Sequence, residues 1–133
     1  MISGGKITSV EAKKLKEGAS VSGMNVNIGI DDVHAEKDKL IFKYTYSIEY
    51  APGVAEFKIS GEIFSDEKNA KQLEEKWKKD KNLEPALAEE LLTAITYSGT
   101  TVGTLLAFSL GIQAPINVPR ARVGAPGQQK SAG

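Results

Sequence analysis

The chain has 133 residues, with 17 basic and 17 acidic side chains, one histidine and no cysteine. Its length predicts one domain, and its composition, 41% hydrophobic and 26% charged, is typical of a globular protein. The lack of cysteine excludes disulfides, zinc–thiolate sites, iron–sulfur clusters and cysteine nucleophiles, and a net charge of zero argues against a nucleic-acid partner.

Alternating patterns in the first half of the chain predict strands. We expect residues 1–5 to form a flexible N-terminus and residues 6–16 to form a short strand. Residues 26–34 predict a half-buried strand, because Val, Ile and Ile alternate with Asn, Asn and Gly. The apolar series then moves one residue out of phase, which predicts a bulge near Asp31-Asp32.

The clearest pattern is a hairpin. Residues 42–50 place aromatic and β-branched side chains at every second position, and residues 57–63 repeat the alternation. Pro52 and Gly53 between them favour a tight turn. We interpret the aromatic row as core in preference to an exposed surface for peptides or single-stranded nucleic acid. Its members are Phe42, Tyr44, Tyr46 and Tyr50.

Two helices follow the strands. Ser65 or Asp66 is a candidate N-cap for a charged surface helix over residues 67–79, whose apolar stripe is narrow. A Glu84-Pro85 step favours the start of a long second helix over residues 86–110, with Gly111 as the stop signal.

The second helix is neutral for most of its length. Residues 91–112 are long enough to span a bilayer, but eight hydroxyl side chains favour a helix buried in protein, with the membrane span as an alternative. One single-faced sheet cannot cover both sides of this helix, so we expect a second copy to cover it, in a homodimer or a dimer of dimers. The predicted interface residues are Leu91, Ile95, Gly99, Val102, Gly103 and Leu106.

The ends of the chain complete the domain prediction. An extended apolar strip occupies residues 114–119, one α+β domain is expected over 6–123, and the composition of 124–133 predicts a disordered tail. The first six residues lack the apolar core of a secretory signal, so the expected location is the cytoplasm.

This arrangement resembles the SecB-type export chaperones. The hairpin IFKYTYSIEYAPGVAEFKISGEIF (41–64) and the strip APINVP (114–119) carry the resemblance, which covers most of residues 6–119. It implies a four-stranded antiparallel β-meander followed by a long apolar helix, assembly through the helices, and binding of unfolded polypeptides in apolar grooves. Here a charged helix is inserted between the sheet and the long helix. The expected client contacts are Phe64, Trp77, Ile116 and Val118.

Other chemistries find little support. Asp32, His34 and Glu36 share a strand face and could ligate a divalent ion, but a solvated strand end explains them more simply. There is no Gly-x-Ser-x-Gly motif, and Glu89 and Glu90 are adjacent on a helix and point apart. We therefore expect no enzyme activity and no cofactor or metal.

Three hypotheses follow. The first is a polypeptide-binding holdase, the second a scaffolding subunit whose long helix docks on a fixed protein partner, and the third a protein tethered to a membrane by residues 91–112. The Lys/Glu-rich, cysteine-free composition suggests an archaeal source.

Overall fold

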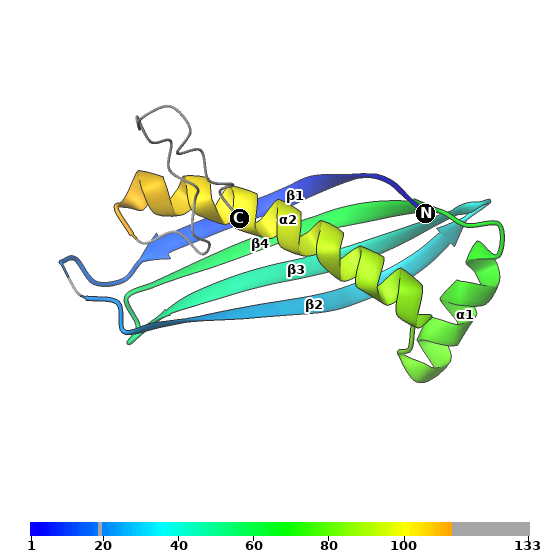
Figure 1. Ribbon diagram of the computed structural model, residues 1–133, viewed down its shortest axis with the longest axis horizontal. Coiled ribbons are helices and arrows are strands. Elements are labelled where there is room, and N and C mark those ends of the chain that lie inside the picture. The colour runs from blue at the N-terminus through cyan, green and yellow to red at the C-terminus, as the bar shows by residue number, and fades with distance from the viewer. Residues whose placement is uncertain (19, 113–133) are drawn as a thin grey trace, which may run out of the picture.

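A computed structural model describes residues 1–18 and 20–112 of the chain. It contains a four-stranded antiparallel sheet followed by two helices, the second long and apolar, which confirms the predicted fold class (Figure 1). The elements are β1 (Ile2–Lys14), β2 (Gly23–Glu36), β3 (Lys39–Ala51), β4 (Ala55–Asp66), α1 (Ala70–Asp80) and α2 (Pro85–Leu110).

The strand order in the sheet is β1-β4-β3-β2. Consecutive strands β2, β3 and β4 form the predicted meander, whereas β1 joins the sheet beside β4 and not beside β2. The chain therefore passes from one edge of the sheet to the other between Lys14 and Gly23. As a result, β1 and β2 are the two edge strands.

The hairpin features agree with the sequence. The register of β2 against β3 shifts between Ile30 and Asp32, which confirms the predicted bulge, and Gly53 in the β3–β4 turn has a φ of +62°. The N-terminus differs from the prediction of a flexible segment. Strand β1 already begins at Ile2, because residues 2–14 pair with β4 along almost their whole length.

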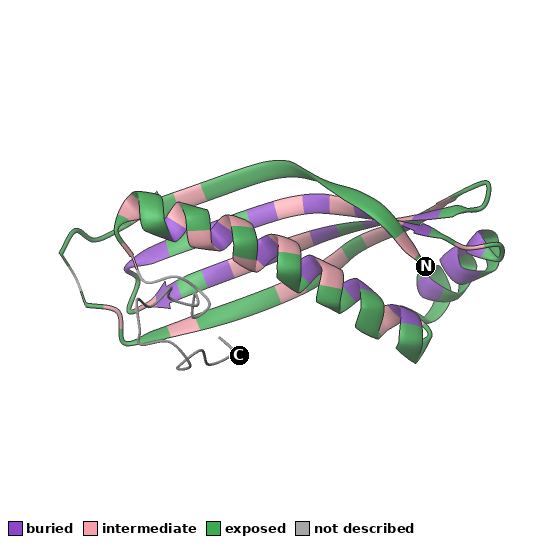
Figure 2. Cartoon of the chain, turned by 45° about the horizontal axis from the view of Figure 1, so that its top comes forward, coloured by how far each residue is buried: buried purple, intermediate pink, exposed green. Residues whose placement is uncertain are grey.

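The core lies between the sheet and α2. Helix α2 crosses one face of the sheet and packs against β4, β3 and β1, while α1 packs against the end of β2 and β3 (Figure 1). Alternation along β3 turns the aromatic row toward this face, where its side chains are at most 1% exposed. The interpretation of the row as core is thus confirmed. Figure 2 shows the buried residues along the central strands.

The helix ends are set by local backbone geometry. Helix α1 begins later than predicted, at Ala70, and its N-cap is Asn69, which makes no side-chain capping bond. Ser65, a predicted cap, is instead buried in β4. Helix α2 ends at Leu110, and Gly111 takes the left-handed conformation with a φ of +68°, as the sequence predicts.

Candidate functional site

The inner face of α2 is fixed to the chain's own sheet. Leu91 and Ile95 are at most 1% exposed, and Gly99 and Gly103 are buried. A Cβ built at Gly99 would lie in the Tyr46 ring, so the absence of a side chain lets the helix backbone rest on that ring. Gly99 therefore serves packing between helix and sheet inside one chain.

This placement corrects part of the interface prediction. Leu91, Ile95, Gly99 and Gly103 are buried within the chain and are not available to a second copy while α2 stays docked. The neutral composition of α2 does not tell which face the sheet covers. Val102 and Leu106, at the border of the two faces, are half-buried.

The outer face of α2 carries large exposed apolar side chains. Phe108 is 89% exposed and Tyr97 is 75% exposed, and Leu92 and Leu105 are also exposed. The hydroxyls on this side donate to carbonyls of the helix itself four residues earlier, as in the bond of 2.6 Å from Thr101 Oγ1 to Tyr97 O. Thr93, Thr100, Thr104 and Ser109 make the same kind of bond. The outer face is thus less polar than its sequence indicates.

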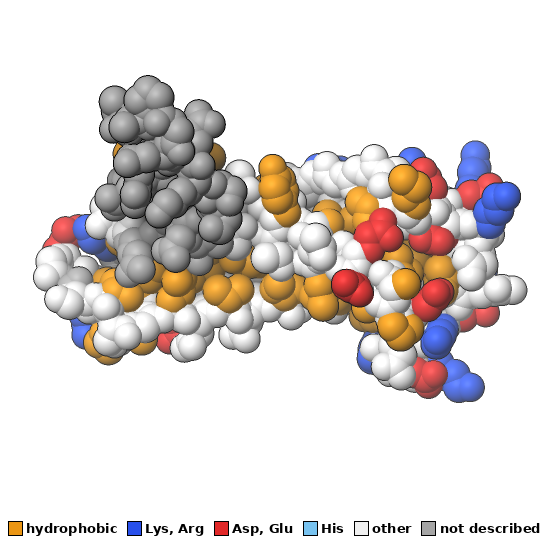
Figure 3. Space-filling model, viewed as in Figure 1, with side chains coloured by type: hydrophobic (Ala, Val, Ile, Leu, Met, Phe, Trp, Pro, Cys, Tyr) orange, Lys and Arg blue, Asp and Glu red, His pale blue; other side chains and the backbone are white. Residues whose placement is uncertain are grey.

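In the part of the chain that the structure describes, open grooves lie on both sides of α2. The larger, of about 710 Å³, lies between α2 and the strands β1, β3 and β4, and the smaller, of about 450 Å³, lies between α2, α1 and β2. Figure 3 shows hydrophobic side chains gathered alongside the helix, with acidic side chains around its first turns. The residues that define the larger groove include Ile7, Tyr44, Ile63, Ala94 and Tyr97.

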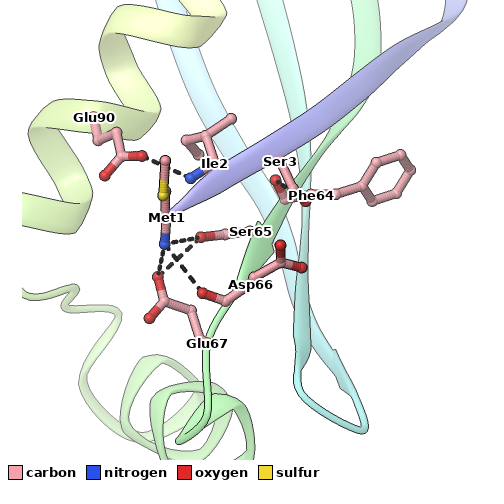
Figure 4. A network of polar contacts seen from close by, with 8 residues as sticks. All are labelled: Met1, Ile2, Ser3, Phe64, Ser65, Asp66, Glu67 and Glu90. Carbon is pink, nitrogen blue, oxygen red and sulfur yellow. Dashed lines mark hydrogen bonds and ion pairs between the residues drawn. The ribbon is translucent and has the colours of Figure 1, made fainter.

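A few polar groups border the larger groove. The buried Tyr44 hydroxyl bonds to Ser98, and burial raises the pKa of Tyr44 while that bond opposes the rise. Glu90 accepts a hydrogen bond of 2.6 Å from the backbone N–H of Ile2, which joins the helix to β1 (Figure 4). This groove is mainly apolar and has a small number of fixed hydrogen-bonding groups, which is typical of a binding site.

The N-terminal ammonium group lies at the end of the sheet where Glu90 bonds to Ile2 (Figure 4). Met1 N contacts Glu67 Oε1 at 2.6 Å and Ser65 Oγ at 3.1 Å. The hydrogen bond to Glu67 raises the pKa of this amino group, and the same bond lowers the pKa of Glu67. These contacts hold Met1, the residue before β1, beside the end of β4.

Helix α1 is pinned to β2 by a buried carboxylate. Glu74 is 3% exposed and accepts a hydrogen bond of 2.7 Å from the backbone N–H of Ala35. That bond is the main cause that lowers the pKa of Glu74 to about 2, against the opposing effect of burial and with help from Lys71 and Lys78. No sequence pattern predicts this contact, because Glu74 looks like one member of a charged surface run.

The single histidine belongs to the same cluster. His34 Nδ1 lies 3.3 Å from Glu74 Oε2, and His34 Nε2 lies 3.8 Å from Glu36 Oε1. Within residues 1–18 and 20–112, no three His, Asp or Glu side chains gather closely enough to hold a metal ion. The His34 side chain is 52% exposed at the edge of the sheet, between the carboxylates of Glu36 and Glu74.

The predicted client contacts are scattered. Trp77 is 8% exposed because it docks α1, and Lys81 Nζ lies 3.8 Å from its ring centroid, yet Trp77 still lines the smaller groove. Phe64 is half-buried and falls on the sheet face opposite α2, since it alternates with the buried Ile63 and Ser65. Ile116 and Val118 lie outside the described residues.

Comparisons with known proteins show which known fold the chain resembles. No family model matches the chain, and no curated protein matches its sequence. Among solved structures, the chain is similar to the Rv1957 SecB-like chaperone of Mycobacterium tuberculosis in complex with a ChAD peptide from the Rv1956 HigA1 antitoxin. The TM-score is 0.58 over 89% of this chain and 90% of that one, at 9% sequence identity. The chain therefore has a SecB-like fold.

Helix α2 also passes a simple test for membrane helices. Its 26 residues contain a window with a mean hydropathy of 1.3, of which 28% is buried inside the structure. Length and composition alone therefore permit α2 to cross a bilayer, but the packed core helices of water-soluble proteins meet the same criteria.

Proposed function

We propose that this protein is a non-enzymatic polypeptide-binding protein that shields apolar segments of unfolded clients in the grooves beside α2. The observation that carries the proposal is the pair of apolar grooves flanking α2 on a SecB-like fold. Binding would bury apolar client side chains transiently and needs no nucleotide, cofactor or metal. The similar mycobacterial chaperone was solved with a peptide bound, which supports a polypeptide ligand.

Assembly is the second part of this proposal. The exposed apolar outer face of α2, centred on Tyr97, Leu105 and Phe108, would pair with the same face of another copy in a homodimer or a dimer of dimers. Such pairing would cover the side of α2 that the sheet leaves open and would form continuous walls for the grooves. The proposed location is the cytoplasm.

An aggregation assay tests the function directly. Reduced, unfolded α-lactalbumin should aggregate more slowly with increasing amounts of the protein, without added nucleotide. Ile7→Lys places a charge in the larger groove and should abolish most of this protection, because burying a charge against client side chains is unfavourable. Val10→Lys, on the same strand but outside the lining, is the control. No protection by the unmodified protein would refute the proposal.

A scaffolding subunit is the alternative function, and the outer face of α2 favours it. A single fixed protein partner could cover Tyr97, Leu105 and Phe108 in place of a second copy. This alternative predicts that one protein of constant stoichiometry is co-purified from the native host and that unfolded clients are not protected. Recovery of the protein in the soluble fraction without detergent would remove the membrane-tether hypothesis.

A further inference from the structure

The two edges of the sheet differ in their protection against an added strand. From residue 23 to 30, β2 contains no charged side chain and no proline. Strand β1 carries charges at Lys6, Glu11, Lys13 and Lys14, and its register against β4 shifts twice. Charges and bulges are the usual means by which proteins prevent strands from pairing at an open edge. The first part of β2 lacks both.

Hydrogen bonding shows which backbone groups of β2 point to the open edge. The Ala35 N–H donates to Glu74 of α1, so it points away from Leu40, its partner on β3. Hydrogen-bonded and non-hydrogen-bonded pairs alternate along an antiparallel ladder, so all pairs made by even-numbered residues of β3 are of the same kind as the Ala35–Leu40 pair. The even-numbered residues of β2 from Met24 to Ile30 also pair with even-numbered residues of β3. Their N–H and C=O groups therefore also point outward.

The same residues present apolar side chains beside the core. Val26 is 45% exposed, and Met24, Ile28 and Ile30 are half-buried against the core. A strand added here would place every second side chain on this face, next to Val26 and Ile28. The side chains between would share the opposite face with Asn25 and Asn27. A segment with apolar residues at alternate positions fits both faces.

Helix α1 and the smaller groove bound this edge. The Glu74 carboxylate occupies the Ala35 N–H, so α1 closes the edge beyond the bulge at Asp31. The groove of about 450 Å³ begins where the open stretch ends, since Ile30 and Asp31 line it together with Trp77, Leu83 and Leu92. A segment lying along the edge would reach this groove at one end.

We propose that the open edge of β2 from Met24 to Ile30 binds an extended polypeptide segment by strand addition, and that the groove beside Trp77 receives an apolar side chain from its end. This inference rests on the proposed function and specifies its mode of recognition. The ligand is an extended segment with alternating apolar residues, recognised through its backbone, so different client sequences can bind.

A matched pair of proline variants tests the proposal. Val26→Pro removes an outward N–H from β2 without breaking the ladder to β3. Val10→Pro does the same on β1, because Val10 pairs with Ile59 and its N–H also points outward. The two valines have almost equal exposure, 45% and 47%. The probe is a fluorescent ten-residue peptide with Val or Ile at alternate positions, Thr or Ser between them and a terminal Trp.

The proposal expects Val26→Pro to weaken binding of this peptide at least tenfold and Val10→Pro to change it less than twofold. It also expects the amides of Val26 and Ile28 in the unmodified protein to gain protection from hydrogen exchange when the peptide binds, a measurement that needs no variant. A shuffled peptide of equal composition should bind more weakly.

Other outcomes would overturn it. If the unmodified protein binds the peptide but the two variants behave alike and the amides gain no protection, strand addition is wrong while the proposed function stands. If Val26→Pro lowers the molecular mass of an assembly and leaves peptide affinity unchanged, the edge joins copies of this chain. If the unmodified protein binds no peptide, both the inference and the proposed function fail.

Discussion

The two faces of α2 both carry large apolar side chains but have different surroundings. On the inner face, glycine and aliphatic side chains match the rings of the sheet so closely that Gly99 has no space for a Cβ. On the outer face, Phe108 and Tyr97 extend away from the chain, while the threonine hydroxyls bond back to the helix. Folding of one chain accounts for the first face only. The second is apolar surface that the chain's own sheet leaves exposed.

The inner face can be tested at its tightest point, where we expect the largest effect. Gly99→Ala adds a Cβ that would overlap the Tyr46 ring and should lower the free energy of unfolding by about 2–3 kcal/mol. In an ordinary helix interior the same substitution would raise it by about 1 kcal/mol, so the sign of the change is diagnostic. Denaturant unfolding measures it. Thr101→Ala on the outer face is the control, and an increase in stability at Gly99 would contradict this packing.

Helix α1 also has an inner and an outer face, because Glu74 is buried and the adjacent Glu75 is exposed. Glu74→Ala removes the acceptor of the Ala35 N–H and should cost about 2 kcal/mol of unfolding free energy. Glu75→Ala, an exposed neighbour, should change stability by less than about 0.5 kcal/mol. Equal effects of the two substitutions would show that α1 is not pinned through Glu74.

The pH dependence of the free energy of unfolding gives a second test of the Glu74 contact. Because the folded state lowers the pKa of Glu74 from 4.5 to about 2, its contribution is complete above pH 4.5 and is lost as the pH falls toward 2. The unmodified protein should therefore lose more stability between pH 5 and 2 than the Glu74→Ala variant. Unfolding curves recorded across this range provide the measurement. Parallel pH profiles for the two proteins would contradict the assigned pKa.

The sequence predicted the helices and strands better than it predicted which face of each helix or strand is covered. Period-two alternation predicted β3 and β4, and the phase shift near Asp31 predicted the bulge, because each depends on neighbouring residues only. The pairing of β1 with β4 involves residues more than forty positions apart, and no local pattern contains it. For the candidate site, the sequence did not tell which of the two faces of α2 the chain's own sheet covers. The contact that decides between them, Gly99 on Tyr46, joins residues 53 positions apart.

Alkaline titration should distinguish buried from exposed tyrosines. Burial raises the pKa of Tyr44 and Tyr46 above 10, and burial with the nearby Tyr46 raises the pKa of Tyr50 to about 12. Since the folded state favours the neutral phenols, their contribution to stability should be constant below pH 10 and fall as the pH rises toward 12. Ultraviolet difference spectra should show these phenols ionising later in the folded protein than in denaturant. Identical titrations in the two states would contradict burial of this row.

Removing apolar surface from the outer face should have almost no effect on folding but a clear effect on assembly. The double variant Tyr97→Ser, Phe108→Ser exchanges two exposed rings for small polar groups and should change the free energy of unfolding by less than about 0.5 kcal/mol per site. Light scattering should give a multiple of 14.3 kDa for the unmodified protein and the single-chain mass for the variant. Lys58→Ser, on the sheet face opposite α2, should leave the mass unchanged. If the unmodified protein stays monomeric at high concentration, the outer face does not join copies, and a different protein must account for its exposed rings.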